Sequence, residues 1–500
     1  MLNLTPAVKL AALKRQKDIE KYASAARLIQ LKVLKGLVSR ASGTEYGRTH
    51  GFAAVGSYED FARNVPVNSY DDLKGDIEKM RMGASDLLWK GAVRNYARSS
   101  GTTSDRSKFI PVSDRGLQAI HYAGGFDSVA LYLRNYPDSR LFAGKGLILG
   151  GSFAPEFCND FSKSGDLSAI LIGNVSPFVN LFRVPSREIA LLPDFETKRD
   201  KIARSIIGEK VTNLSGVPSW MMSVLERVLE LTGKSNISEV WPDLEVFFHG
   251  GVAFTPYRER YKAMIPSPGM HFMETYNASE GFFGIQDDPL DKAMLLMIDY
   301  DVFYEFIPMD EYMAGNMSGI VPLWGVEPGV NYAMVISTSC GLWRYLIGDT
   351  VMFTSKDPYK FIITGRTKNF INALGEEVIV DNAEKAVKAA CEATGADVRE
   401  YTAAPLFKEN GFVHQWLIEF RRAPSSLEKF TEALDTELRA VNSDYDAKRS
   451  KDIVMQMPEI LVARENQFDD WLASKGKLGG QHKVPRLCND RKIMEELLKI

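Results

Sequence analysis

The sequence has little of what usually marks a metal, membrane or nucleic-acid protein. It holds four cysteines and six histidines, and the cysteines are far apart, so neither a disulfide framework nor a zinc site is predicted. No run of about 18 apolar residues occurs, so no transmembrane helix is predicted. The 61 basic and 64 acidic residues nearly balance, so no overall field attracts nucleic acid or an anionic membrane. We therefore expect a small-molecule partner and a cytoplasmic protein.

Several catalytic motifs are missing as well. No GxxxxGK[ST] loop occurs, and GKGLILGG does not have the GxGxxG spacing of dinucleotide-binding loops. There is no HExxH, and Ser152 and Ser279 both lack the second flanking glycine of a GxSxG elbow. These absences argue against P-loop, Rossmann, metalloprotease and α/β-hydrolase interpretations.

The first 40 residues are basic and have a helical period. Such a segment could be a membrane-surface helix or a transit peptide. Asp18 and Glu20 interrupt it, so we favour a helix packed against its own domain.

The order of apolar segments predicts an α/β protein with two domains. Strand-like and helical runs alternate from about residue 90 to 300, which is typical of a parallel α/β sheet. Closely spaced strand patterns between about 300 and 365 predict an appended antiparallel sheet or barrel. A helix, strands and a further helix follow. We predict an N-terminal domain of residues 1–365 and a small, mobile α+β domain of residues 366–500, with a hinge near 364–369.

Five segments carry residue types that suit a nucleotide, although each has a plainer interpretation. SSGTTSDRSK, residues 99–108, is a hydroxyl-rich loop that could surround phosphate oxygens or be a solvated turn. DLEVFFHGG ends in a glycine pair that could admit a flat ring or be a strand-end turn. YNASEG offers an aromatic ring, a hydroxyl and a carboxylate within five residues. Asp349 follows a glycine in LIGD, and Lys483 lies in GGQHKVPR, where a lysine is more often simply solvated.

Taken together and in order, these motifs resemble the acyl acid amido synthetase family, which comprises the auxin-responsive plant family and its bacterial relatives, within the adenylate-forming superfamily. The resemblance extends from TEYGRTHGF through GVPSW and WPDLEVFFHGG to GGQHKVPR, and so covers nearly the whole chain.

The resemblance implies an ATP- and Mg²⁺-dependent ligase. A small carboxylic acid would be adenylated and its acyl group passed to the amine of an amino acid. ATP phosphates would be held by Ser99, Ser100, Gly101, Thr102, Thr103 and Lys108, with Thr102, Thr103 and Lys483 catalytic. Gly250 and Gly251 would line the adenine pocket, and Tyr276, Ser279 and Glu280 would serve adenine, phosphate and Mg²⁺. The ribose aspartate would be Asp349, and the hinge-side arginine Arg366.

The acyl pocket is less defined by sequence. It is expected near His121, Val217 and Trp220, although a histidine on such a helix is more often structural. Two departures from the family pattern concern the site: Ser104–Asp105 where a second loop glycine is usual, and Leu346 where many plant members carry arginine. An acyl-CoA ligase with the same adenylation step, or a non-catalytic nucleotide-binding protein, would be alternatives. We expect a monomer.

Overall fold

The structure of the protein is a computed structural model that describes residues 3–99, 108–251, 254, 257–367, 370–408, 411–450, 454–474 and 484–500. The chain divides into two compact units, one up to Gly365 and one from Arg366 onward. Within the described ranges, no helix is both long and apolar enough to cross a bilayer.

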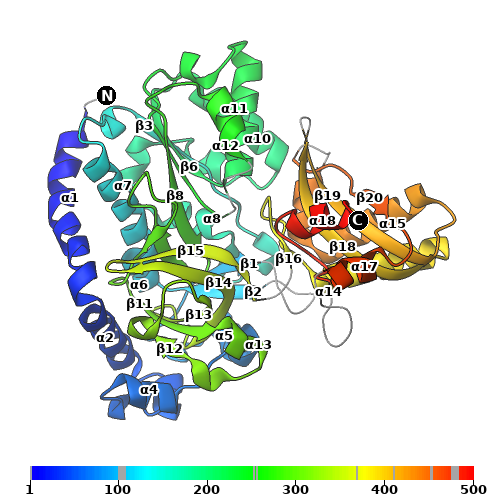
Figure 1. Cartoon of the computed structure of the whole chain (residues 1–500). Helices are drawn as coiled ribbons and strands as arrows, with labels where there is room; N and C mark the ends of the chain where they lie inside the picture. Colours follow the sequence, from blue (N-terminus) through cyan, green and yellow to red (C-terminus); the bar gives the residue numbers. More distant parts are fainter. Residues whose placement is uncertain are drawn as a thin grey trace. The chain divides into compact units, whose positions relative to one another are not determined.

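A twelve-stranded mixed sheet forms the centre of the first unit (Figure 1). Its parallel half contains, in spatial order, β5 (Arg183–Val184), β3 (Lys145–Ile148), β6 (Val211–Gly216), β7 (Val246–His249) and β8 (His271–Ala278). The sheet continues through β9 (Gly281–Ile285), β10 (Met294–Leu296), β15 (Tyr359–Arg366), β14 (Tyr345–Lys356), β13 (Asn331–Thr338), β11 (Val302–Pro308) and β12 (Val321–Pro322).

The α/β fold predicted from the sequence is confirmed, and the antiparallel strands extend the parallel sheet. Pairing is antiparallel from β8 to β9 and from β9 to β10, so β8 is the strand where the two halves join. All four residues of β7 are buried, as expected for a central strand covered on both faces. β7 pairs with β8, so its carboxyl end lies beside β8. The carboxyl ends of parallel strands are where open α/β sheets bind ligands.

The first unit also has a separate three-stranded sheet. β1 (Asn95–Ser99) pairs antiparallel with β2 (Lys108–Val112) and parallel with β4 (Lys163–Gly165). The pairing of β1 and β2 ends with Ser99 opposite Lys108. β1 and β2 therefore flank the predicted phosphate loop.

Helices cover both sheets of this unit. They are α1 (Thr5–Glu20), α2 (Tyr22–Ala41), α3 (Glu45–Thr49), α4 (Tyr58–Asn64), α5 (Tyr70–Arg81), α6 (Asp114–Gly116), α7 (Ala123–Asn135), α8 (Leu167–Asn174), α9 (Arg187–Ala190), α10 (Phe195–Ile206), α11 (Pro218–Thr232), α12 (Arg258–Met264) and α13 (Met309–Met313). A π-helical turn, Leu117–Tyr122, joins α6 to α7.

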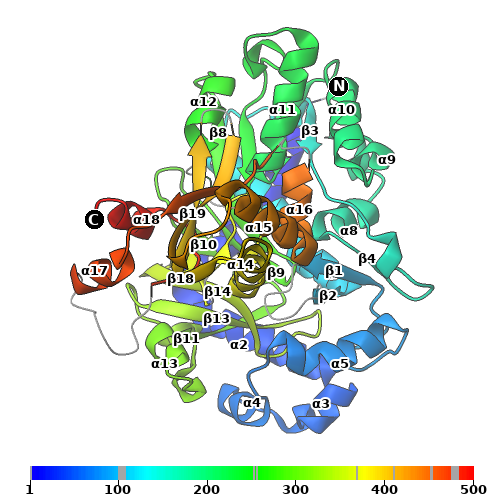
Figure 2. The same cartoon turned by 90° about the vertical axis from the view of Figure 1, so that its right-hand side faces the viewer.

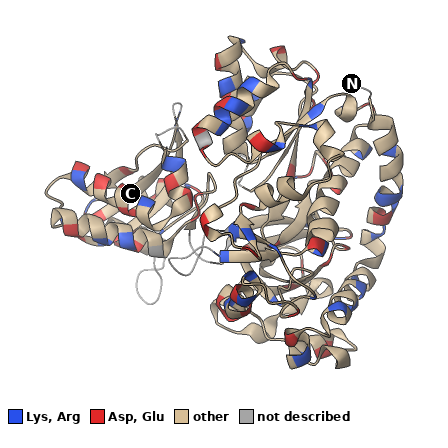
Figure 3. Ribbon diagram, turned by 180° about the vertical axis from the view of Figure 1, so that it is seen from behind, with Lys and Arg blue, Asp and Glu red and all other residues tan. Residues whose placement is uncertain are grey.

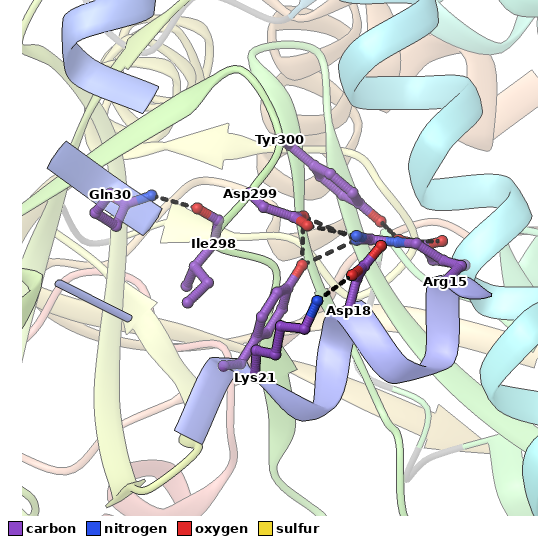
Figure 4. Close-up of polar contacts among 9 residues, drawn as sticks. Arg15, Asp18, Lys21, Gln30, Ile298, Asp299 and Tyr300 are labelled. Carbon is purple, nitrogen blue, oxygen red and sulfur yellow. Dashed lines mark hydrogen bonds and ion pairs between the residues drawn. The ribbon is translucent and has the colours of Figure 1, made fainter. Parts of the chain in front are cut away.

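The N-terminal helices α1 and α2 pack on the rest of the unit, as the sequence suggested. Ile19, Tyr22, Leu34 and Leu37 are buried at helical spacing. On the same side, Arg15 bonds two carboxylates from distant segments, Asp127 of α7 and Asp299 (Figure 4). Both apolar burial and a buried ionic cluster therefore hold these helices.

The second unit is a small α+β domain (Figure 2). Its strands are β16 (Phe370–Ile371), β17 (Val378–Ile379), β18 (Asp397–Lys408), β19 (Gly411–Arg422) and β20 (Glu459–Val462). Its helices are α14 (Val380–Thr394), α15 (Leu427–Val441), α16 (Ser443–Arg449), α17 (Gln467–Ser474) and α18 (Lys492–Leu497). α14 and α15 pack on each other, and α14 stops at Gly395, whose φ of 70° suits a left-handed helix cap.

Candidate active site

Tyr276 and Asp349, predicted to serve adenine and ribose, are brought together. The Tyr276 hydroxyl donates a hydrogen bond to Oδ2 of Asp349, and each residue is only 8% exposed. Their strands, β8 and β14, are separated in the sheet by β9, β10 and β15. At about 4.8 Å per strand, a flat sheet would hold them roughly 19 Å apart. The sheet is therefore strongly curved here, and the curvature creates the site.

A bulge in β14 positions Asp349. Across β13, Val335 pairs with Leu346 and Ala333 with Thr350, so two residue steps on one strand face four on the other. Gly348 within the extra segment has φ of 92°, a conformation that side chains other than glycine rarely adopt. Such bulges re-aim side chains next to functional sites. Leu346 itself packs in a satellite apolar cluster around β11 and β13, so it serves packing there.

The glycine pair lies directly beside the tyrosine segment. A Cβ atom added to Gly250 would lie 2.3 Å from the carbonyl oxygen of Thr275, the residue before Tyr276. Thr275 also donates its hydroxyl to the carbonyl of His249 at 3.2 Å. Gly251 has φ of 84°. Only glycine allows the end of β7 to approach β8 this closely, and the pair therefore borders Tyr276.

Ser279 and Glu280 form the two-residue turn of the β8–β9 hairpin. Ala278 and Gly281 are paired on either side of them. Both side chains are half-buried. Since the turn directly follows the strand that carries Tyr276, a hydroxyl and a carboxylate are fixed on the same hairpin as the aromatic ring.

His121 contacts this hairpin from the π-helical turn before α7. Its Nδ1 lies 3.0 Å from Oδ1 of Asn277, the residue after Tyr276. Burial lowers the pKa of His121 to about 4, and the contact with Asn277 only partly offsets this, so the imidazole is neutral near pH 7. π-Helical turns are frequent at functional sites.

The other residues expected at the acyl pocket lie at the start of α11. Val217 is the N-cap residue, and its Cγ2 would lie 3.4 Å from a Cβ added to Gly251. Trp220 is half-buried in the first turn of the helix. Val217 is therefore placed beside the glycine pair, on the side of the parallel strands.

The remaining predicted residues are placed only in part. Lys108 begins β2, and its ammonium lies 5.8 Å from the ring centroid of Tyr70. Ser99 and Arg366 end β1 and β15, and only their backbone is described. Outside the described residues are Ser100, Gly101, Thr102, Thr103, Ser104, Asp105 and Lys483.

Some residues of this region were not predicted from the sequence. Phe283 and Phe361 pack against the Tyr276 ring, with centroid distances of 5.0 and 6.1 Å. Asn277 contacts His121 although it stands inside the YNASEG motif. No sequence pattern marked Asn277, because the β8–β9 register shifts between Tyr276 and Asn277 and regular strand alternation is broken there.

The second unit has its own buried polar contact near its start. Glu376 is fully buried and accepts hydrogen bonds from the backbone N–H groups of Ala373 (3.1 Å) and Leu374 (2.6 Å). Nε2 of His414 lies 2.8 Å from its Oε1. This arrangement fixes the segment between β16 and β17, and no motif or periodicity predicts it.

Comparison with known proteins was decisive for the family. The GH3 family N-terminal domain matches residues 15–270, more than half of the 500-residue chain. The chain belongs to the GH3 family. The GH3 central domain matches residues 295–366 and the GH3 C-terminal domain residues 381–492. The family predicted from the motifs is thereby confirmed.

Similar GH3 proteins span the full length of the chain. Indole-3-acetic acid-amido synthetase GH3.3 of Arabidopsis thaliana is 25% identical, with 96% of this chain and 92% of that protein aligned. The 4-substituted benzoates-glutamate ligase GH3.12 of the same plant is 23% identical, with 96% of each chain aligned. The solved structure of the acyl acid amido synthetase AtGH3.15 has a TM-score of 0.63 at 18% identity, covering 100% of this chain and 97% of that one. The structural likeness shows a shared fold.

Proposed function

We propose that this GH3 protein is an ATP-dependent ligase that adenylates a small carboxylic acid and transfers the acyl group to the amine of an amino acid. The observation that carries the proposal is the Tyr276–Asp349 contact beside Gly250, in a chain that matches all three GH3 domains. An aromatic ring, a carboxylate and exposed backbone are the groups that an adenosine moiety needs.

Nucleotide binding follows from this arrangement. The adenine ring would lie between the Gly250–Gly251 backbone and Tyr276. Asp349 accepts a hydrogen bond from Tyr276, and its carboxylate is the group that would accept the ribose hydroxyls. The phosphates would meet donors from Ser279 and from the end of β1, the following loop and the start of β2. These residues are Ser99, Ser100, Gly101, Thr102, Thr103 and Lys108, with Arg366 near the hinge.

Glu280 is the residue that fits Mg²⁺. It is half-buried on a fixed hairpin turn, and Mg²⁺ in phosphate-transfer sites typically uses one or two carboxylates together with phosphate oxygens. When bound, Mg²⁺ neutralises charge on the phosphates.

The adenylation step joins two anions. A carboxylate oxygen attacks the α-phosphorus, the bond from that phosphorus to the bridging oxygen breaks, and pyrophosphate leaves. We propose that Lys483 and the donors of Thr102 and Thr103 stabilise the charge that develops on the phosphoryl oxygens. Loss of one such donor would cost on the order of 3 kcal/mol in the barrier.

In the second half-reaction, the acyl group of the adenylate is transferred to the amine of an amino acid. The amine nitrogen attacks the acyl carbon, AMP leaves and the nitrogen loses a proton. We propose that residues 1–365 form the adenylation domain and that residues 366–500 move between the two half-reactions, withdrawing Lys483 after the first.

The relatives suggest the substrate class. Their names specify indole-3-acetic acid and 4-substituted benzoates as acids, and glutamate as one amino acid. We propose a small, partly apolar acid for this chain, bound near His121, Val217 and Trp220. We further propose a cytoplasmic monomer, since ATP and reduced thiols occur there and all four cysteines are free.

Product analysis tests the proposal. The protein is incubated with ATP, Mg²⁺ and a panel of carboxylic acids, together with either amino acids or coenzyme A. An amide product supports the ligase, whereas a thioester without amide would establish an acyl-CoA ligase. ATP binding without any acid-dependent turnover would indicate a non-catalytic nucleotide-binding protein.

A variant separates the two half-reactions. Lys483→Ala should depress adenylation strongly while amide formation from supplied acyl adenylate continues. Lys499→Ala, which removes an exposed lysine at the C-terminus, is the matched control and should keep both activities. Equal loss of both steps in Lys483→Ala would contradict the role given to this lysine.

A further inference from the structure

The outward face of α1 and α2 is basic although the protein as a whole is not. Exposed cations along the two helices outnumber the anions of the same stretch, which are the exposed Glu20 and Asp18, whose side chain is 39% exposed and pairs with Lys21. The whole chain carries a formal net charge of −3. The exposed cations are Lys14, Lys17, Lys21, Arg27, Lys32, Lys35 and Arg40. In Figure 3 several blue bands, with red between them, mark the helices below the N-terminus.

Large apolar side chains interrupt the same face. Leu10 and Leu28 are each 72% exposed and Leu13 is 51% exposed, far more than leucines packed in a core. At 100° per residue, Leu10, Lys14 and Lys17 share one side of α1. Leu28, Lys32 and Lys35 share one side of α2 in the same way. Each helix therefore carries leucine and lysine on one outward stripe.

The inward contacts of these helices fix which face points outward. Nη2 of Arg15 lies 2.7 Å from Oδ2 of Asp127 and 2.8 Å from Oδ1 of Asp299. The Gln30 side chain donates to the carbonyl of Ile298 at 2.7 Å (Figure 4). Because both helices are anchored, the Leu–Lys stripe is a permanent surface.

We propose that this stripe docks the protein on the surface of an anionic lipid bilayer. Lysines near such a surface are attracted by its negative potential, and their long stems let the ammonium groups reach lipid phosphates while neighbouring leucines enter the boundary layer. α1 and α2 have 16 and 20 residues, and α2 is kinked at Ala25, so each helix presents its own stripe, roughly 24 and 30 Å long at 1.5 Å per residue.

Two other partners fit the stripe less well. A second copy of the chain would bring like charges together, which opposes self-association through this face. A nucleic acid would pair with the lysines but would leave the exposed leucines without a role. The inference departs from the expectation of no membrane partner, which rested on the nearly balanced total charge and on Asp18 and Glu20 within the basic N-terminal segment.

Vesicle sedimentation tests the inference with the full-length protein. Vesicles of phosphatidylcholine alone are compared with vesicles made of equal parts of phosphatidylcholine and phosphatidylglycerol. We expect binding only to the anionic vesicles, weakening as salt is raised because the charges are exposed. Hydrogen exchange should show added protection confined to α1 and α2 on the vesicles.

Charge and leucine variants each have a matched control. Each lysine near the surface contributes about five-fold in partitioning, so the fourfold charge reversal should abolish binding. Each leucine should contribute on the order of ten-fold. The test variants are K14E/K17E/K32E/K35E and L10S/L28S. The controls, which change exposed residues elsewhere in the same unit, are K90E/K201E/K234E/K292E and L181S/L290S.

Three outcomes would overturn the inference. The first is the absence of binding to phosphatidylglycerol vesicles. The second is an equal loss of vesicle binding in the test and control variants. The third is binding to heparin or duplex DNA that is as strong as vesicle binding and is unchanged in L10S/L28S. The last result would make the stripe a polyanion site. Retained ligase activity and circular dichroism in every variant would show that lost binding does not reflect unfolding.

Discussion

Replacing Arg15 by methionine would remove the cation that holds two carboxylates together. Nε of Arg15 lies 2.9 and 2.8 Å from the two carboxylate oxygens of Asp127, which is 2% exposed. Asp299 bonds the same guanidinium and accepts from Tyr22, and Tyr300 donates to Asp127 at 2.8 Å. The variant keeps most of the stem volume but leaves both carboxylates without their counter-charge.

The structure sets the size of the effect. Breaking a buried ion pair from one side costs about 3–5 kcal/mol. The side chains of Arg15 and Asp299 are 21% and 25% exposed, so we expect a loss of about 3 kcal/mol in the free energy of unfolding, at the lower end of that range.

The loss should depend on pH in a defined direction. Burial raises the pKa of Asp127, and the hydrogen bonds from Arg15 partly counter this. Without Arg15 the pKa rises further. A group with a raised folded-state pKa stabilises the fold below its unfolded pKa, near 4, and this contribution is lost as pH rises through the folded-state value. The deficit of Arg15→Met should therefore grow from about pH 4 toward pH 7.

Urea unfolding, with hydrogen exchange of α1 and α7, is the assay. Arg63→Met is the control, since its side chain is 71% exposed and pairs only weakly with Asp60. Adding Asp127→Asn to Arg15→Met should recover part of the loss. A loss below about 1 kcal/mol for Arg15→Met, or one that shrinks as pH rises, would refute the reasoning.

Three further changes probe the site. Tyr276→Phe removes the donor to Asp349 and should raise the KM for ATP about ten-fold with kcat for amide formation less affected; an unchanged KM would contradict a shared nucleotide role. Gly250→Ala forces a Cβ against a backbone carbonyl of β8 and should cost about 2 kcal/mol in urea unfolding, whereas Gly75→Ala, in open space on a helix, should be neutral or stabilising. His121→Gln should change the KM for the acid and not that for ATP. The pKa of His121 is lowered to about 4, so its contribution to the free energy of unfolding is present above about pH 6.5 and is lost as the pH falls toward 4. His121→Gln should lack this pH dependence of the free energy of unfolding.

Local features of the fold were predictable from sequence because they depend on short-range rules. The apolar run before Gly250 predicts a buried strand, and β7 is fully buried. The segment ending at Gly395 predicts a helix with a glycine stop, which is α14. Such patterns follow from periodicity and from the conformational freedom of glycine.

Contacts between distant segments were not predictable in the same way. The Tyr276–Asp349 bond depends on sheet curvature across three intervening strands, and Arg15 and Asp299 are 284 positions apart in the chain. Periodicity identifies a buried face but not its partner. The order of the motifs, by contrast, predicted Tyr276 and Asp349 as site residues, but it did not indicate that their side chains touch.

The distribution of charge shows a similar limit. Composition gave a nearly neutral chain and so no overall field for an anionic partner, yet exposure separates the half-buried Arg15 from outward lysines such as Lys14 and Lys17. Which side of a helix faces solvent depends on tertiary packing, which the count of charges does not contain.

ATP–pyrophosphate exchange over a library of small carboxylic acids tests the central claim most directly. The account predicts Mg²⁺-dependent exchange that requires an acid, and loss of that exchange in Lys483→Ala but not in Lys499→Ala. Exchange that is absent for every acid in the library, in a protein that binds ATP, would contradict it.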